Sequence, residues 1–277
     1  MSTESSGEQV EQEWAPPGID TTIPHSARMY DWWLGGKDNF ASDRQLGEMF
    51  VQAIPTIRTM AQENRAFMHR STRYLVNQGI DQFLDIGTGI PTKPNLHETA
   101  QELNPEARVV YVDNDPIVLV HARALMVSDE RGRTEYIHAD LMEPDKILAD
   151  GALLNTLDLS RPVGLMLIAV LMLLADEDDP WGKAKTLMDA LPSGSYVAIT
   201  HPGQDFDPEA MANIVAAAQQ GQMTVVPRVR DDVAKFFADW ELVDPGVTPV
   251  MAWRPEDGEM PENPNAAYYW AGVARKP

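Results

Sequence analysis

From residue 82 to residue 201, short apolar runs alternate with longer amphipathic segments, and this order constrains the fold more than any other feature. Strict alternation of strands and helices is typical of a parallel sheet with helices on both faces. The run 163–170 is apolar throughout, as expected for a central strand that is buried on both sides. The predicted strands are 82–87, 108–113, 134–140, 163–170 and 196–201, and helices are expected near 95–103, 116–126 and 180–191, with a helix or loop at 144–149.

The segment before the first strand reads as a polar tail followed by three helices. Residues 1–18 are rich in Ser, Glu and Gln and end in Pro-Pro-Gly, so we expect a disordered tail. A short helix is predicted to start with Ser26 as its N-cap and to stop at Gly35. Two longer helices are expected at 43–54 and 56–77. We therefore expect a helical cap over residues 19–80 and an α/β domain over residues 81–277.

After the fifth strand, the pattern predicts two more helices and a closing strand. The helices are expected at 208–220 and 230–240, and 241–244 is a candidate short strand. Aromatic and β-branched residues make 267–275 a strand by composition.

The first predicted strand runs into a glycine turn, Asp85-Ile86-Gly87-Thr88-Gly89. Glycine permits backbone angles that other residues avoid and lets a ligand approach the main chain closely. A dinucleotide-binding fingerprint would place a third glycine where this chain has Thr92, which weakens that interpretation. A tight turn that binds nothing remains an alternative.

Acidic residues end the next two predicted strands. Asp113 follows the glycines at a spacing somewhat beyond the ~20 residues at which an acidic residue holds a ribose diol. A carboxylate would repel a phosphate, so Asp113 favours a nucleoside without one. Asp140, followed by Leu141, can accept a hydrogen bond from an adenine amine. The alternatives are a helix-capping role, for which Asp115 before Pro116 is better placed, and a strand end facing water.

Together these motifs resemble the three cofactor motifs of class I S-adenosylmethionine-dependent methyltransferases. With the segment Tyr30–Phe40, they are similar to an S-adenosyl methyltransferase family abundant in actinomycetes and long catalogued only as a domain of unknown function. The resemblance runs from about residue 19 to the C-terminus. It implies a Rossmann-like, seven-stranded sheet with the last strand antiparallel, and S-adenosylmethionine as the cofactor.

By this resemblance, the glycine turn contacts the methionine part of the cofactor, Asp113 the ribose, and Asp140 with Leu141 the adenine. The resemblance also implies that Ala169, with Val170 at the end of the fourth predicted strand, lies beneath the sulfonium. We further expect the segment 30–40 to form a lid, with Tyr30 near the methionine end. The candidate cofactor-binding residues are Tyr30, Gly36, Asp85, Gly87, Thr88, Gly89, Asp113, Asn114, Asp140, Leu141 and Ala169.

The acceptor and the catalytic group are less well defined. Trp32 or Trp33 lines the acceptor pocket if the lid closes; otherwise both simply pack the helix on the core. Histidine is a suitable general base near neutral pH, and His201 and His25 are the candidates. A structural role for His201 before Pro202 is the competing interpretation. No spacing of histidines or carboxylates predicts a metal site.

Charge and the fourth predicted strand narrow the partner class. The chain has 42 acidic and 22 basic residues and a net charge of −20, which disfavours nucleic acid. The fourth strand ends in Ala169-Val170-Leu171-Met172 and lacks the Asn/Asp-Pro-Pro-aromatic motif that the resemblance associates with base methylation.

The same sequence predicts a cytoplasmic protein. No signal peptide is evident at residues 1–13, and the longest apolar run, 163–175, is shorter than the ~20 residues of a membrane span. We expect a methyltransferase that acts on an unidentified small molecule, without nucleic-acid or membrane partners. The alternatives are a non-catalytic S-adenosylmethionine sensor and an NAD-dependent oxidoreductase on the same architecture.

Overall fold

The computed structural model describes residues 19–125 and 128–277. The predicted tail, residues 1–18, and the last residue of the predicted helix 116–126 therefore lie outside the described residues. Along the sheet the strands follow the order β3-β2-β1-β4-β5-β8-β6, and β7 pairs with β8 beside this path. The strands are β1 (Gln82–Ile86), β2 (Arg108–Asp113), β3 (Arg133–His138), β4 (Gly164–Ile168), β5 (Tyr196–Pro202), β6 (Glu241–Leu242), β7 (Thr248–Pro249) and β8 (Tyr269–Arg275).

The predicted fold class is confirmed. Strands β1 to β5 are parallel, and the closing strand β8 runs antiparallel to β5. Seven strands lie along the path, as expected. Strand β7 is an addition, and with two residues it is too short to produce a recognisable sequence pattern.

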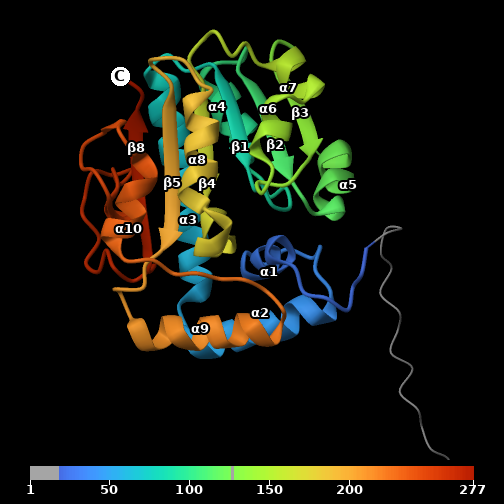
Figure 1. Ribbon diagram of the computed structural model, residues 1–277, viewed down its shortest axis with the longest axis vertical. Helices are drawn as coiled ribbons and strands as arrows, with labels where there is room; N and C mark the ends of the chain where they lie inside the picture. The colour runs from blue at the N-terminus through green and yellow to red at the C-terminus, as the bar shows by residue number, and fades with distance from the viewer. Residues whose placement is uncertain (1–18, 126–127) are drawn as a thin grey trace, which may run out of the picture.

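Helices cover both faces of this sheet (Figure 1). Alternate strand residues face opposite ways, so that Phe83 packs in one core cluster and Leu84 in the other, and both are fully buried. The helices are α1 (Ser26–Trp33), α2 (Ala41–Ala53), α3 (Ile57–Asn77), α4 (Leu96–Leu103), α5 (Pro116–Leu125), α6 (Pro144–Leu148), α7 (Gly151–Thr156), α8 (Pro180–Asp189), α9 (Pro208–Gln220) and α10 (Arg230–Ala234).

Helices α1, α2 and α9 form a layer below the carboxyl ends of the parallel strands (Figure 1). Residues 19–80, the predicted cap, supply α1 and α2, whereas α3 runs up against the sheet and contacts β4, β5 and β8. Helix α9 comes from a distant part of the chain and lies beside α2. We refer to α1, α2 and α9 as the cap.

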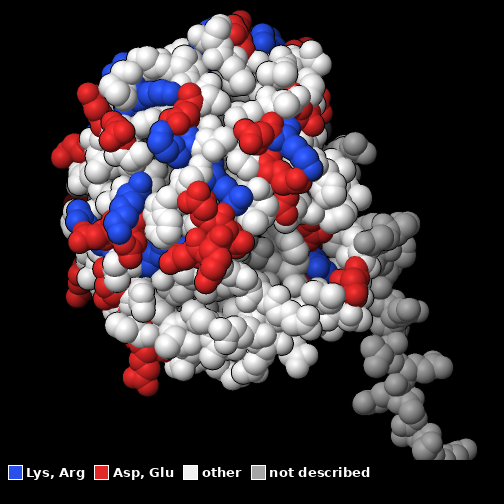
Figure 2. Space-filling model, in the orientation of Figure 1, with Lys and Arg blue, Asp and Glu red and all other residues white. Residues whose placement is uncertain are grey.

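Charged side chains are unevenly distributed over the molecule (Figure 2). In this view they gather on the sheet part, including acidic groups along the border that faces the cap, while the cap surface is almost free of charge. Within residues 19–125 and 128–277, no helix combines the length and apolar character needed to cross a membrane.

Two helix predictions differ in detail from the structure. The N-cap of α1 is His25, not Ser26, because the His25 side chain accepts a hydrogen bond from the amide of Ala27. The predicted helix 230–240 ends at Ala234 and continues as a 3-10 turn. Ala238, directly after this turn, has a φ of 48°, and Phe236 and Phe237 within the turn are buried in the core.

Candidate functional site

A cavity lies between the carboxyl ends of the parallel strands and the cap. Consecutive strand ends supply one wall, as expected for ligand sites in open α/β sheets. Ten of the eleven candidate cofactor residues line it: Tyr30, Asp85, Gly87, Thr88, Gly89, Asp113, Asn114, Asp140, Leu141 and Ala169.

Gly36 is the candidate that the structure does not bring to the cavity. It lies directly against the Asp31 side chain, where any Cβ would overlap the carboxylate. Asp31 in turn accepts hydrogen bonds from the amide of Asp38 and from Asn39. Gly36 therefore shapes the loop after α1 and is at most indirectly connected to a ligand.

The glycine turn has the backbone conformation that its sequence predicts. Gly87 and Gly89 have φ values of 72° and 71°, and a Cβ on Gly87 would overlap the Val170 side chain. The Asp113 carboxylate fixes the turn, since Oδ2 accepts from the Gly89 amide at 2.8 Å and Oδ1 accepts from the Asp115 amide at 2.9 Å. The glycine turn and the end of β2 are thus one connected unit.

Two buried carboxylates meet at this turn. Burial, with the neighbouring Asp113 carboxylate acting in the same direction, raises the pKa of Asp85 to about 7, although Arg65 opposes the shift. Burial also raises the pKa of Asp113, although its two backbone hydrogen bonds oppose the shift. Excess negative charge at this wall favours a cationic ligand.

A guanidinium provides the opposite charge in the same cavity. Arg65 lies on α3, lines the cavity and donates hydrogen bonds to the carbonyls of Thr92 and Pro94 after the glycine turn. Sequence reasoning missed Arg65, because nothing in the local pattern of α3 distinguishes it from the other arginines of that helix.

The end of β3 is tied to the end of β2. Asn114 donates from its side-chain nitrogen to Asp140 Oδ2 at 3.1 Å, and Asp140 Oδ1 accepts from the Met142 amide at 2.8 Å. This arrangement orients the Asp140 carboxylate at the rim of the cavity.

A chain of hydrogen bonds connects the cap to the end of β4. The Tyr30 hydroxyl donates to the Ala61 carbonyl at 2.7 Å and accepts from the Asn64 side chain at 3.0 Å. Thr200 donates to Asn64 Oδ1 at 2.5 Å and accepts from the Ala169 amide at 2.9 Å. Ala169 is held at φ 53°, an unfavourable angle for a non-glycine residue, so its position depends on this support.

Of the two adjacent tryptophans, only Trp33 lines the cavity. Its ring stacks on Phe50 of α2 with centroids 5.6 Å apart. Trp32 instead packs near Gly47 and lies under the guanidinium of Arg58 at 4.8 Å. The structure therefore separates the two side chains that the sequence left undecided.

His201 is buried and does not line the cavity. Its Nε2 lies 2.9 Å from Arg228 Nη1, and its ring stacks on Phe236. Burial, with the Arg228 guanidinium acting in the same direction, lowers the pKa of His201 to about 3. His201 is therefore a neutral packing partner of Arg228 and is not placed to remove a proton from a ligand in the cavity.

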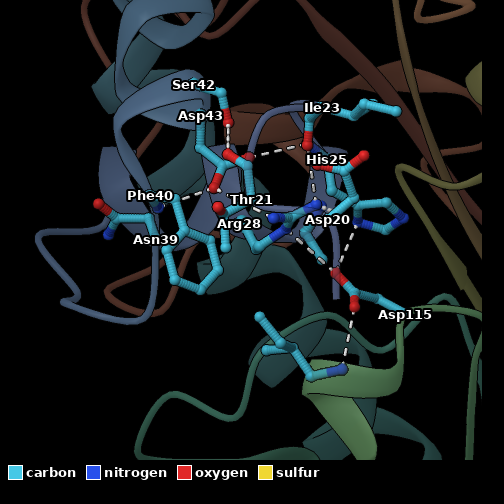
Figure 3. A network of polar contacts seen from close by, with 12 residues as sticks. Asp20, Thr21, Ile23, His25, Arg28, Asn39, Phe40, Ser42, Asp43 and Asp115 are labelled. Carbon is cyan, nitrogen blue, oxygen red and sulfur yellow. Dashed lines mark hydrogen bonds and ion pairs between the residues drawn. The ribbon is translucent and has the colours of Figure 1, made fainter. Parts of the chain in front are cut away.

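His25 does line the cavity, but it belongs to a buried polar network (Figure 3). Its Nδ1 lies 3.1 Å from Asp115 Oδ2. Arg28 lies between two carboxylates, with Nε 3.3 Å from Asp115 Oδ2 and Nη1 3.6 Å from Asp43 Oδ2. Asp43 also accepts from the amides of His25 and Phe40, both at 2.8 Å. The network joins α1 and α2 of the cap to the residue two positions after Asp113.

Among the described residues, no group of three or more His, Asp or Glu side chains is arranged to hold a metal ion. The arrangement instead offers a cleft with carboxylates at three strand ends, one guanidinium, and a cap wall of aromatic and thioether groups.

Comparisons with known proteins agree with this geometry. Residues 12–277 match the family described as S-adenosyl methyltransferase. A DUF574 family protein from Streptomyces avermitilis is 41% identical, with 93% of this chain and 99% of that chain aligned and a TM-score of 0.88. A Thermobifida fusca protein, provisionally assigned as a methyltransferase, is 39% identical, with 95% and 99% aligned and a TM-score of 0.86. No curated protein shows a significant match.

Proposed function

Because this chain belongs to the S-adenosyl methyltransferase family and is therefore an S-adenosylmethionine-dependent enzyme, we propose that the cofactor binds in the cavity across β1, β2 and β3 and that the enzyme methylates a small molecule there. The paired buried carboxylates at the glycine turn, Asp85 and Asp113, are the observation that carries this proposal. A ligand bearing both a sulfonium and an ammonium group compensates their charge.

The cofactor supplies an electrophilic methyl group, and the residues of the chain hold its parts. Asp113 would accept hydrogen bonds from the ribose hydroxyls, and Asp140 with Leu141 would contact the adenine. Asp85 would face the ammonium group and Arg65 the carboxylate of the methionine part. Methyl transfer depends mainly on the alignment of donor and acceptor. The hydrogen bond from the Ala169 amide to Thr200 and the cap over the cavity would both favour this alignment.

The carboxylates argue against one alternative, and the open cavity argues against the other. A pyrophosphate at the glycine turn would be placed against Asp85 and Asp113, so NAD is a poor ligand for this wall. A non-catalytic sensor would have its acceptor side filled, whereas Trp33 and Met172 line an open cavity.

Calorimetric titration tests the proposed cofactor. S-Adenosylhomocysteine, the product form, should bind one site per chain, while NAD should show no binding at the same concentrations. Labelled S-adenosylmethionine incubated with a small-molecule extract should transfer its methyl group. Binding of NAD and not of S-adenosylhomocysteine would contradict the proposal.

The affinity for S-adenosylhomocysteine should depend on pH through Asp85. Only the ionised carboxylate pairs with the ammonium group, and burial raises the pKa of Asp85 to about 7 in the free protein. Affinity should therefore rise with pH, being about tenfold weaker at pH 6 than at pH 8. Asp85→Asn should bind more weakly and show a flat profile over this range; a similar slope in the variant would assign the titration to another group.

A further inference from the structure

The cavity continues beyond the strand ends that the proposed cofactor site uses. In the sheet order, β4 and β5 lie on the opposite side of β1 from β2 and β3. The proposed cofactor, spread over β1 to β3 and reaching Ala169 at the end of β4, would leave free the part of the cavity that lies towards the cap. We call this part the acceptor chamber, and its principal wall residues are Met29, Trp33, Phe50, Met68, Met172 and Met223.

The chamber wall is assembled from distant segments. Met172 lies in the 3-10 turn after β4, and its carbonyl accepts from the Val226 amide at 2.9 Å. This bond holds the segment that follows α9, including Met223, against the end of β4. The cap closes the other side through the stacked pair Trp33 and Phe50.

The wall chemistry favours a flat, apolar molecule. The Trp33 ring is fixed because its Nε1 donates to the Gly47 carbonyl at 3.3 Å and its face meets Phe50. The methionine side chains are flexible and polarisable, and they make favourable contacts with aromatic rings. A rigid indole beside thioethers is therefore a suitable surface for a planar ring system.

Polar groups on this side are already paired with one another. The Tyr30 hydroxyl and the Asn64 side chain bond to each other, and each has a second partner, in the Ala61 carbonyl and the Thr200 hydroxyl respectively. Burial raises the pKa of Tyr30 to about 12, so its phenol stays protonated at neutral pH. Neither group offers an anchor for a charged substituent.

The charged and titratable imidazole, guanidinium and carboxyl groups that line the cavity lie elsewhere. Within residues 19–125 and 128–277, the carboxyl groups that line the cavity are those of Asp85, Asp113 and Asp140 at the strand ends. The imidazole is that of His25, in the network near Asp115, and the guanidinium is that of Arg65 on α3. All of these face the proposed cofactor site or the cap network. A charged acceptor would thus lose its hydration in the chamber without gaining a partner.

We propose that the methyl acceptor is an uncharged, planar aromatic small molecule whose nucleophile is a ring hydroxyl, ring thiol or ring nitrogen. This inference rests on the proposed function. A lone pair of that atom forms the bond to the methyl carbon as the sulfur–carbon bond breaks, and the sulfonium becomes a neutral thioether. A proton carried by the nucleophile passes to water, since the chamber wall supplies no base.

Binding of matched probes to the protein saturated with S-adenosylhomocysteine tests the proposal. The probes are 2-naphthol and 6-hydroxynaphthalene-2-sulfonate, which share the ring and hydroxyl but differ in charge. We expect 2-naphthol to bind at least about tenfold more tightly. Trp33→Ala should weaken 2-naphthol binding by about tenfold or more without changing the affinity for S-adenosylhomocysteine. The neighbouring Trp32→Ala, outside the cavity, is the matched control and should leave both affinities unchanged.

A second variant guards against loss of folding in Trp33→Ala. Met172→Glu places a carboxylate in the chamber at a partly exposed position and should also weaken 2-naphthol binding by about tenfold. Three outcomes would overturn the inference, provided that S-adenosylhomocysteine still binds. These are equal affinity for the two probes, binding of neither probe, and an unchanged 2-naphthol affinity in both Trp33→Ala and Met172→Glu. Failure of S-adenosylhomocysteine to bind the unaltered protein would instead overturn the proposed function, and this inference with it.

Discussion

Arg28→Met should lower the free energy of unfolding by about 3–5 kcal/mol, as measured by urea denaturation. Arg28 is 4% exposed and is the cation between Asp43 and Asp115, which are 0% and 4% exposed. Methionine has a similar volume but no charge, so both carboxylates would remain buried without it. Removing one member of a buried ionic cluster costs more than the cluster itself contributes, because the remaining charges are left uncompensated.

Lys37→Met is the matched control, since Lys37 is exposed in the same part of the chain and the charge change is identical. It should alter the unfolding free energy by less than about 0.5 kcal/mol. The double variant Arg28→Met, Asp43→Asn should recover part of the loss.

Acid should relieve the Arg28→Met defect. Burial raises the pKa of Asp43 even beside Arg28, and removing the guanidinium raises it further. A raised folded-state pKa contributes stability at low pH that is lost as the pH rises, so the variant should be closest to the unaltered protein near pH 5. A loss that stays constant between pH 5 and pH 8 would contradict charge burial as its cause.

Asp113→Ala should weaken S-adenosylmethionine binding by about 1–3 kcal/mol, or roughly 5- to 150-fold, in calorimetric titration. The variant removes the proposed ribose acceptor and also releases the amide of Gly89 that Asp113 Oδ2 binds at 2.8 Å. Both effects act on the same ligand, because the turn and the ribose site are joined through one carboxylate.

Asp113→Asn separates the two contributions, since it keeps one side-chain oxygen for a backbone amide but removes the charge. It should bind with intermediate affinity. Asp129→Ala removes an acidic group from the exposed turn before β3, at the amino ends of the parallel strands. This variant should bind S-adenosylmethionine with unchanged affinity. Unchanged affinity in folded Asp113→Ala would exclude Asp113 from the site.

The structure brings together the motifs that the sequence defines within a few neighbouring residues. The turn from Asp85 to Gly89 and the acidic ends at Asp113 and Asp140 all line one cavity. Each depends on a local rule, either glycine at positive φ or an acidic residue at or just after the carboxyl end of a strand. Parallel strands bring such ends to one edge, so the order of elements was enough to predict their convergence.

Residues whose role depends on remote packing were not predicted. Arg65 and Asn64 sit on α3 with no local signal, and they reach the cavity because α3 packs beside β4 and β5. His201 lies near the carboxyl end of β5, as Asp113 lies at the end of β2, but it meets Arg228 from a distant loop and is buried.

The sequence by itself determined the α/β sheet and the residues at its carboxyl edge, because side-chain periodicity and glycine turns are local properties of the chain. The antiparallel direction of the closing strand followed from the family resemblance and not from any local pattern. Only the tertiary structure decided that α9 joins the cap, that Trp33 and not Trp32 faces the cavity, and that Arg28 neutralises two carboxylates. These outcomes depend on which side chains from distant segments exclude water together. Burial and charge compensation belong to the folded assembly of segments, and no single segment encodes them.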